Sequence, residues 1–314
     1  MDVKDIKKIF VVGAGTMGSG LAQAYAEAGY QVTLYSRTQQ TLDKAVTLAK
    51  SSLETVAAEG LVNAKDIPVI MGRIKTTTSV EEGAKDADIA VETIVEVAEE
   101  KKKIFKQLDQ YLPQRAIIAS NTSFLNIFDI VETNRPDKVL SAHWYAPPQL
   151  IPFVEVARGP KTSDASVQLI VDVLKKMGKK PAVMQKFIPG FIINRFLVAL
   201  QREVYYLVDN GYMEPEGIDE AARWGLALRM IIVGILQRMD YGGIDISVKN
   251  LNNPNTAPVP PDYTPKKIFE LYEKGNYGVK TGKGWYDYSG KTQAEWNRER
   301  DLGIIRLLKS LKLK

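Results

Sequence analysis

Residues 8–18 have the sequence KIFVVGAGTMG, in which an apolar run is followed by a turn that contains three glycines. The apolar run 8–12 predicts a buried strand, and the pattern over 16–29 predicts a helix. The glycines therefore join a strand to a helix, which is the setting that gives a GxGxxG sequence its meaning. This stretch decides the class of fold for the N-terminal part of the chain.

Each glycine of this turn has a separate physical task. Gly13 permits a tight turn, Gly15 lets the backbone approach a pyrophosphate, and Gly18 lets the helix pack closely on the strand. The pyrophosphate would lie at the N-terminus of the helix, beside Thr16 and Met17. We expect a dinucleotide-binding turn, and the alternative is a glycine-rich turn without a ligand.

Strand and helix patterns continue to alternate as far as residue 184. This alternation predicts a parallel, doubly wound sheet of the α/β class. The predicted strands are 32–35, 89–93, 116–120, 138–142, 154–157 and 181–184, and the predicted helices between them are 39–60, 98–111 and 164–177.

The pattern changes after residue 190. Residues 190–250 have helical periodicity, 252–265 form a proline-rich loop, and 295–313 predict an amphipathic helix. We therefore expect a Rossmann-type doubly wound sheet over residues 1–187, followed by an all-helical C-terminal domain over residues 188–314.

The end of the second predicted strand distinguishes between the two nicotinamide dinucleotides. A site for NAD usually has Asp or Glu there, which binds the ribose 2′-hydroxyl. This chain has Ser36 and Arg37 instead. A guanidinium binds a 2′-phosphate well and a hydroxyl adds a hydrogen bond, so we expect NADP to be preferred over NAD. The alternative is a solvated surface arginine with NAD bound through other contacts.

The chain has one histidine, His143, at the end of a predicted strand. Glu155 follows twelve residues later, within an apolar run that predicts a neighbouring strand. A buried glutamate needs a partner, and an imidazole is a natural one, since the carboxylate holds one tautomer and increases its basicity. On this pattern alone, a structural histidine stays a strong alternative.

Other polar residues lie at predicted strand ends or on an apolar helix. Ser123 and Asn121 follow one strand, Glu96 follows another, and Lys101 lies in the helix after it. Ser123 has a structural alternative as the N-cap of a helix. Glu96 has one as well, a favourable contact with a helix N-terminus. Asn194 lies among apolar residues of a predicted helix, where a helix–helix tether is the alternative.

Composition excludes several classes of protein. The 314 residues include no cysteine and one histidine, which excludes disulfide scaffolds and thiolate zinc sites, and we expect no metal. The net charge of +5 is concentrated in 291–314, which argues against a nucleic-acid-binding face. The charged start predicts no signal peptide, and no run is apolar enough for a membrane span, so we expect a cytoplasmic protein.

Taken in order, six motifs resemble those of the 3-hydroxyacyl-CoA dehydrogenase family over about residues 6–288. They are GAGTMG at 13–18, VETIVE at 91–96 with Lys101, NTS at 121–123, the spacing of His143 and Glu155, PGFIINR at 189–195, and GVKTGKGWYDY at 278–288.

The resemblance implies a helical C-terminal domain that dimerises, and it implies roles for several residues. His143 would be the general base that takes the hydroxyl proton as hydride leaves the carbon, with Glu155 as its orienting partner. Ser123 and Asn194 would hydrogen-bond the reacting oxygen. The expected cofactor-binding residues are Gly13, Gly15, Thr16, Met17, Gly18, Ser36, Arg37, Glu96, Lys101 and Asn121.

The chain departs from the family pattern at several places. The family usually has Asn-Pro three residues after the histidine, and here Ala146 precedes Pro147. Acyl-CoA members often carry lysines near the CoA phosphates in the segment that corresponds to 54–62, which is acidic here. The stretch after His143, with Pro147-Pro148 and Ile151-Pro152, looks more like branches that act on small free acids, such as L-gulonate dehydrogenases (relatives of lambda-crystallin), carnitine dehydrogenases and an enzyme of pyridoxine-derivative breakdown.

A free carboxylate would need a cation, for which Arg223, Arg229 and Arg238 are candidates, although a solvated helix face is the favoured explanation for them. We expect an oxidoreductase that interconverts a secondary alcohol and a ketone in a 3-hydroxyacyl-CoA or 3-hydroxy acid. The alternatives are a dehydrogenase of a small free hydroxy acid and a non-enzymatic, crystallin-like cofactor-binding protein.

Overall fold

The computed structural model describes residues 2–255 and 259–311 and divides into two compact units. The first unit contains Met1–Asn194 together with Asn297–Lys314, and the second contains Arg195–Trp296. This division differs from the predicted 1–187 and 188–314, because the last part of the chain packs on the first unit.

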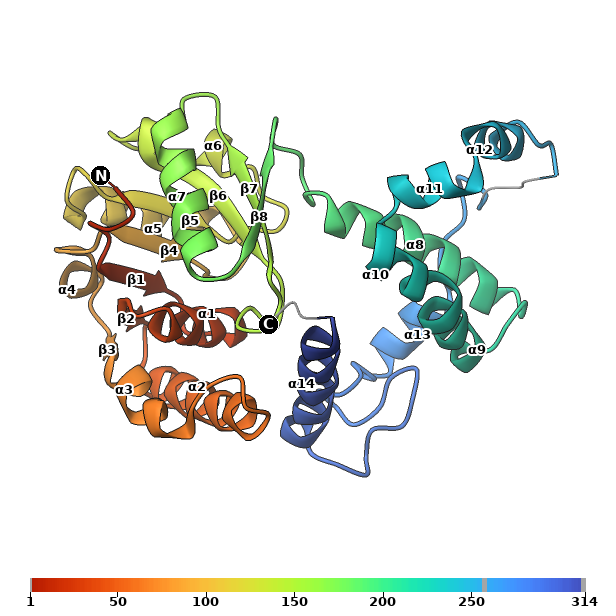
Figure 1. The fold of residues 1–314 in the computed structure, drawn as a ribbon, viewed down its shortest axis with the longest axis horizontal. Coiled ribbons are helices and arrows are strands. Elements are labelled where there is room, and N and C mark those ends of the chain that lie inside the picture. Colours follow the sequence, from red (N-terminus) through yellow and green to blue (C-terminus); the bar gives the residue numbers. More distant parts are fainter. Residues whose placement is uncertain (1, 256–258, 312–314) are drawn as a thin grey trace. The chain divides into compact units, whose positions relative to one another are not determined.

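An eight-stranded sheet in the order β3-β2-β1-β4-β5-β6-β7-β8 organises the first unit (Figure 1). Six neighbouring pairs run parallel, and the order from β3 to β6 is that of a doubly wound dinucleotide-binding sheet. The strands are β1 Lys8–Val12, β2 Gln31–Tyr35, β3 Ile74–Thr77, β4 Ile89–Glu92, β5 Ile117–Ser120, β6 Val139–Trp144, β7 Phe153–Arg158 and β8 Lys180–Met184.

The predicted parallel, doubly wound sheet is confirmed except at one place, because β6 and β7 are antiparallel. Only residues 145–152 join these strands. A parallel pair needs a crossover of a dozen or more residues, whereas an antiparallel pair needs only a short connection. The short connection in the sequence was the signal for this reversal.

Helices cover both faces of the sheet. Alternate strand residues pack on one face against α1, α2, α3, α7 and part of α14, and on the other face against α4, α5 and α6. Their bounds are α1 Thr16–Glu27, α2 Gln39–Ala58, α3 Ile67–Gly72, α4 Val80–Ala84, α5 Ala98–Tyr111, α6 Ile127–Ile130, α7 Asp164–Lys176 and α14 Gln293–Ser310, with short 3₁₀ turns η1 Ala64–Asp66 and η2 Pro136–Lys138.

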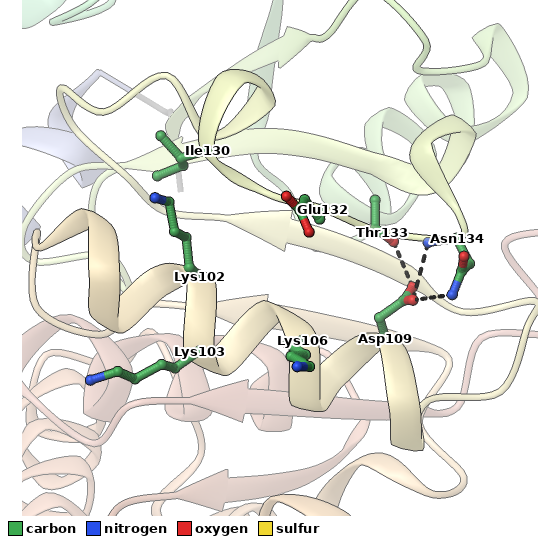
Figure 2. A pocket seen from close by; sticks show the side chains of 8 residues that line it. All are labelled: Lys102, Lys103, Lys106, Asp109, Ile130, Glu132, Thr133 and Asn134. Carbon is green, nitrogen blue, oxygen red and sulfur yellow. Dashed lines mark hydrogen bonds between the residues drawn. The ribbon is translucent and has the colours of Figure 1, made fainter.

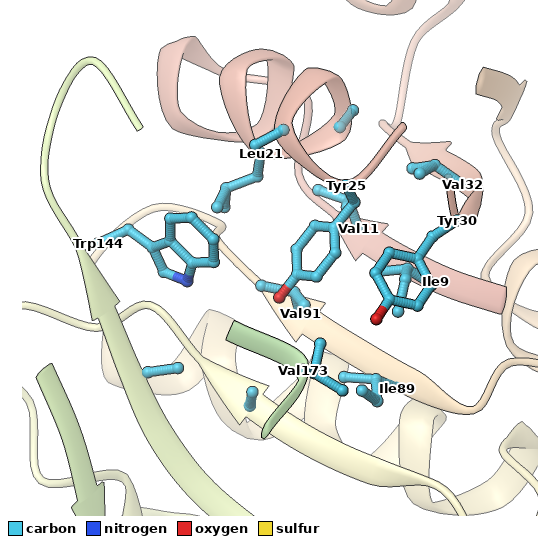
Figure 3. Close-up of a cluster of buried hydrophobic side chains, with 14 of the residues drawn as sticks. Ile9, Val11, Leu21, Tyr25, Tyr30, Val32, Ile89, Val91, Trp144 and Val173 are labelled. Carbon is cyan, nitrogen blue, oxygen red and sulfur yellow. The ribbon is translucent and has the colours of Figure 1, made fainter. Parts of the chain in front are cut away.

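The larger core lies on the α1 face of the sheet (Figure 3). Tyr25 of α1 packs its ring against Trp144 of β6, with 5.7 Å between the ring centroids. Val11 and Val91 from the central strands lie in the same cluster. The sequence pattern predicted most of these elements, but it did not predict β3, α3 or α4, which lie between residues 67 and 84. Edge strand β3 is mostly polar, and Thr77 is the one buried residue among its four, so it has no apolar run to reveal it.

The C-terminal helix α14 returns to the first unit. Ile305 is fully buried and Leu308 is 7% exposed, and Ile305 belongs to the core of the α1 face. Arg306 pairs with Glu59, just after α2, at 3.2 Å, and the Lys309 ammonium donates to the Glu59 carbonyl. The predicted helix 295–313 is present over 293–310, and its last residues lie outside the described ones.

Helices are the main regular elements in the described residues of the second unit, as predicted, and two isolated β-bridges join Lys283 to Gly278 and Asp287. Val208 is the one buried hydrophobic side chain in the described part of this unit. Its elements are the major part of α8 Ile193–Asp209, then α9 Pro215–Glu220, the π-helix η3 Ala221–Ala227, α10 Leu228–Val233, α11 Leu236–Gly242, α12 Ile244–Leu251 and α13 Lys267–Glu273.

Candidate active site

The loops that carry the predicted site residues follow neighbouring strands. In the sheet order β2-β1-β4-β5-β6, the strands lead to residues 36–37, 13–18, 93–96, 121–123 and finally His143. The carboxyl ends of parallel strands meet at one edge of a sheet, and ligands bind there where the strand order reverses, which here is between β1 and β4. The sheet therefore lines up these residues along one edge.

The glycine turn fits a dinucleotide. Gly13 has a φ of 116°, which favours glycine, and a Cβ on Gly18 would lie 1.7 Å from the Gly13 carbonyl oxygen. Around Gly15, in contrast, a Cβ would meet nothing within 4 Å, and no side chain caps the N-terminus of α1. The first-turn N–H groups beside Thr16 and Met17 are thus available to a pyrophosphate.

Ser36 and Arg37 follow β2 directly. The Ser36 N–H donates to the Thr77 carbonyl, which holds the turn against β3. Arg37 is exposed, and its guanidinium makes no hydrogen bond or ion pair in the described part of the chain. Glu100, a nearby carboxylate, is paired with Lys103 at 2.8 Å. The Arg37 side chain is therefore available to a ligand.

His143 and Glu155 face each other across two strands. They are register partners in the antiparallel pair β6 and β7, so their side chains lie on the same face of the sheet. His143 Nδ1 lies 3.1 Å from Glu155 Oε2, with His143 3% exposed and Glu155 fully buried. The spacing of twelve residues in the sequence is thus the span of one short hairpin.

The Glu155 carboxylate accepts four hydrogen bonds. Oε2 accepts from His143 Nδ1 and from the Tyr145 hydroxyl, and Oε1 accepts from the N–H groups of Ile192 and Ile193 at 2.9 and 3.3 Å. Burial alone would raise the pKa of Glu155, but these donors outweigh it and lower the pKa below its ordinary value. Glu155 is therefore a carboxylate at neutral pH.

This carboxylate determines which nitrogen of His143 is basic. An ionised carboxylate only accepts, so Nδ1 carries the proton and Nε2 of the neutral ring carries the lone pair. Nε2 lies 3.2 Å from Ser123 Oγ, which puts a hydroxyl and a basic nitrogen side by side. Ser123 does not cap the next helix, since Asn126 is the N-cap of α6.

Aromatic rings enclose the imidazole. Phe191 stacks on His143 with 4.5 Å between ring centroids, and Tyr145 contacts it edge-on at 4.6 Å. Phe191 is fully buried and has a φ of 52°, which is rare for a residue other than glycine. The segment that leads into α8 thus supplies both a ring against His143 and two N–H donors to Glu155.

Glu96 holds the loop that carries Ser123. Its Oε1 accepts from the Thr122 hydroxyl and from the N–H groups of Ser123, Phe124 and Leu125, at 2.6 to 3.2 Å. Burial raises the pKa of Glu96, but these bonds and the Lys101 charge outweigh it and lower the pKa to about 2. Glu96 therefore fixes Ser123 beside His143.

Lys101 is buried behind this loop. Its ammonium, in a side chain that is 1% exposed, pairs with Glu92 at 2.7 Å and Glu96 at 3.2 Å. Asn121 bridges neighbouring strands, since its side-chain oxygen Oδ1 accepts from the Trp144 N–H at 2.8 Å. Through these contacts Lys101 and Asn121 hold the loops at the carboxyl edge of the sheet in place.

Asn194 is the second residue of α8 and is half-buried. Its side chain makes no hydrogen bond within the described part of the chain. The structure thus brings His143, Glu155 and Ser123 into one hydrogen-bonded set, whereas Asn194 lies outside that set.

A hollow of about 560 Å³ lies between α5 and residues 130–134 (Figure 2). Lys102 and Lys103 at its rim pair with glutamates of their own helix, and Asp109 binds Thr133 and Asn134. None of its lining residues belongs to the hydrogen-bonded set around His143. This hollow is not the candidate active site.

The sequence reasoning missed Tyr145, Phe191 and Glu92 as contributors to the site. Glu92 is a buried charged residue at the end of the apolar strand IAVE, a signal similar to the one that singled out Glu155. Tyr145 and Phe191 gave no signal of their own, because aromatic residues beside a strand end or a helix start are common in protein cores.

Comparisons with known proteins show the class to which this chain belongs. The model of the 3-hydroxyacyl-CoA dehydrogenase NAD-binding domain matches residues 8–187, and that of the C-terminal domain of the same family matches residues 190–288. The chain belongs to the 3-hydroxyacyl-CoA dehydrogenase family. It is accordingly a nicotinamide-dependent dehydrogenase that acts on a CH–OH group, as expected.

Individual relatives cover nearly the whole chain. A probable 3-hydroxybutyryl-CoA dehydrogenase of Bacillus subtilis is 35% identical over 92% of this chain and 99% of its own length. Among solved structures, an NAD⁺-dependent 5-formyl-3-hydroxy-2-methylpyridine 4-carboxylic acid 5-dehydrogenase is 28% identical, with a TM-score of 0.88 over 98% of this chain and 99% of its own. The (S)-3-hydroxybutyryl-CoA dehydrogenase PaaH1 of Ralstonia eutropha is 31% identical, with a TM-score of 0.70 over 90% and 99%.

Replacing Glu96 with Gln should weaken the loop of Ser123 and change the acid stability. The folded-state pKa of Glu96, about 2, lies below its ordinary 4.5, so its contribution is present above pH 4.5 and is lost as the pH falls towards 2. With a 34% exposed side chain, we expect Glu96→Gln to cost about 1 to 2 kcal/mol at pH 7. Urea unfolding from pH 7 to pH 3 measures this.

The exposed Glu99 on α5 provides the matched control, since Glu99→Gln removes a carboxylate paired only with a surface lysine. We expect that variant to unfold within about 0.5 kcal/mol of the wild type. Equal losses in the two variants would contradict a special role for Glu96.

Proposed function

We propose that the chain interconverts a secondary alcohol and a ketone of a 3-hydroxyacyl-CoA or 3-hydroxy acid, with His143 as the general acid and base. The observation that carries this proposal is the set formed by Glu155, His143 and Ser123, joined at 3.1 and 3.2 Å at the carboxyl edge of the sheet. This set fixes the tautomer of the single histidine. Its Nε2 atom faces Ser123, in the loop that follows β5.

The proposed roles follow from these contacts. Glu155 holds the Nδ1 proton and stabilises the imidazolium, while His143 Nε2 takes the hydroxyl proton of the substrate. Ser123 hydrogen-bonds the same oxygen, and we assign Asn194 to that oxygen as well. The nicotinamide, when bound, supplies hydride transfer. A regulatory or crystallin-like role has less support, because such a role does not require this dyad.

We assign the cofactor to the edge from β2 to β5. The glycine turn and the uncapped α1 support pyrophosphate binding. The residues proposed to bind or to shape the cofactor site are Gly13, Gly15, Thr16, Met17, Gly18, Ser36, Arg37, Glu96, Lys101 and Asn121. Glu96 and Lys101 form an ion pair with each other, which favours a role in shaping the loops of the site over direct contact with the cofactor.

A small free hydroxy acid is the second candidate substrate. The turn after α2, where acyl-CoA members were expected to carry lysines for CoA, carries Glu59 here and is bound by Arg306 and Lys309 of α14. Helix α14 lies beyond the residues that match the family models. The pyridine carboxylate dehydrogenase, whose name gives a small carboxylic acid and no CoA, also supports this candidate.

Turnover with acetoacetyl-CoA tests the main proposal. We expect purified protein to oxidise a reduced nicotinamide cofactor with this substrate, and His143→Gln to lower kcat by about 10²- to 10⁴-fold because the general acid is lost. The variant should still bind the cofactor. Full activity of His143→Gln would contradict the mechanism, and no turnover with acetoacetyl-CoA but turnover with gulonate or carnitine would favour the second candidate.

We further propose that NADP is preferred over NAD. Ser36 replaces the usual acidic residue, and the guanidinium of Arg37 is exposed and without a hydrogen-bonded partner in the described residues. The relative with a TM-score of 0.88 is described as NAD⁺-dependent, so this preference would distinguish the chain from it.

Arg37→Ala should weaken binding of NADPH by about 10- to 100-fold and leave NADH nearly unaffected, since charge-assisted hydrogen bonds to the 2′-phosphate are lost. Fluorescence titration with both cofactors measures this. Arg115→Ala is the control, because Arg115 pairs with Asp88 before the start of β4, at the opposite edge of the sheet. Tighter binding of NADH than of NADPH by the wild type would refute the preference.

We also propose a homodimer formed through the second unit, and we assign the protein to the cytoplasm. The second unit exposes many large apolar side chains, among them Trp224, Ile232 and Leu236 at 69 to 76%. So little burial gives a folded domain insufficient core, and an obligate partner surface would supply it. Residues 2–255 and 259–311 include no helix with the length and hydropathy needed to cross a membrane.

Light scattering on the eluted protein should give about twice the mass of one chain. Dissociation on dilution should accompany loss of helical signal, because the exposed apolar faces are stabilised by the partner. A single-chain mass at micromolar concentration, with unchanged helicity, would contradict the homodimer.

A further inference from the structure

One oxygen of the buried carboxylate is shared between two donors. Glu155 Oε2 accepts from His143 Nδ1 and also from the Tyr145 hydroxyl, while Oε1 is engaged by Ile192 and Ile193. Since Glu155 is fully buried, no water competes for these sites. The negative charge that His143 experiences is therefore divided with Tyr145.

Tyr145 acts in this set as a donor only. Burial, followed by the hydrogen bond to Glu155 and its charge, raises the pKa of Tyr145 far above its ordinary value. The phenol thus keeps its proton at neutral pH. Its ring is also held in place, packed edge-on against His143 and stacked with Phe153 at 6.3 Å.

We propose that Tyr145 is a positioning residue that tunes the basicity of His143 through Glu155. By donating to Oε2, the hydroxyl withdraws part of the carboxylate charge from the imidazole. It thereby disfavours the imidazolium and keeps His143 available as a base at lower pH. The inference depends on the proposed function only for its consequence in catalysis.

The other charges around His143 do not account for such an effect. Glu92, Glu96 and Lys101 form a paired cluster behind the loop of Ser123, and none of them contacts Tyr145. Phe191 and Phe153, which pack on the two rings, are uncharged. A change at the Tyr145 hydroxyl would thus reach His143 through Glu155.

The single histidine makes the test direct. NMR titration of protein labelled in histidine reports His143 alone, without substrate or cofactor. In Tyr145→Phe the ring stays and the hydroxyl is lost, so we expect the midpoint of the His143 titration to rise by about 0.5 to 1 pH unit. No shift or a downward shift would overturn the proposal.

Tyr263→Phe is the matched control. Tyr263 also donates its hydroxyl to a carboxylate, that of Asp209, but in the second unit. Its loss should leave the His143 midpoint unchanged, even if the thermal midpoint falls in both variants. An equal shift in Tyr263→Phe would mean that the effect is general and would overturn the proposal.

Two further measurements separate tuning from packing. Wild-type protein with 3-fluorotyrosine in place of tyrosine has more acidic, more strongly donating phenols, so the midpoint should move downward without any cavity. In a Glu155→Gln background, Tyr145→Phe should cause no further shift, because the connecting carboxylate is gone. Failure of either expectation would contradict the pathway through Glu155.

Kinetics then connect the inference to catalysis. Where the protein turns over a hydroxy substrate, the acid limb of kcat/KM in Tyr145→Phe should move upward with the NMR midpoint, with KM little changed. A titration shift in a protein without turnover would refute the proposed function but not the tuning. Turnover without a titration shift in Tyr145→Phe would refute the tuning by Tyr145 but not the proposed function.

Discussion

The buried charge of Glu155 is the constraint on which the site depends. A carboxylate without water is costly unless donors surround it, and here four converge on its two oxygens. Those donors come from the end of β6, from the residue after it and from the start of α8. The hydrogen bonds to this one carboxylate therefore fix the tautomer of His143. They also hold Tyr145 and the backbone of residues 192–193, where α8 begins.

The reversal of β7 makes that arrangement possible. In an antiparallel strand the first residues lie at the edge where the parallel strands end, so Glu155, the third residue of β7, lies opposite His143. The same edge carries the glycine turn after β1 and the loops after β4 and β5. Cofactor and proton-transfer residues are thereby ordered along one line, each on a rigid strand end.

Glu96 and Lys101 illustrate how buried electrostatics support this edge. Glu96 gathers the amides of the Ser123 loop, and Lys101 joins it to Glu92 at the end of β4. The C-terminal helix adds a second level of support, since Ile305 completes the core behind the opposite face of the sheet. The hydrogen bonds to Glu96 hold the Ser123 loop so that its hydroxyl lies beside His143.

The sequence alone was sufficient for the strand, glycine turn and helix at residues 8–29, for most strands, and for the pairing of His143 with Glu155, because periodicity and a charge inside an apolar run are local signals. Only the tertiary structure showed the direction of β7, the polar edge strand β3 and the return of α14 to the first unit, which depend on contacts between distant segments. It also showed that Tyr145 shares the Glu155 carboxylate and that Phe191 stacks on His143. An aromatic residue has no sequence pattern that tells a hydrogen-bonded partner of a buried charge from an ordinary core residue, because that difference arises only when strands and linker meet.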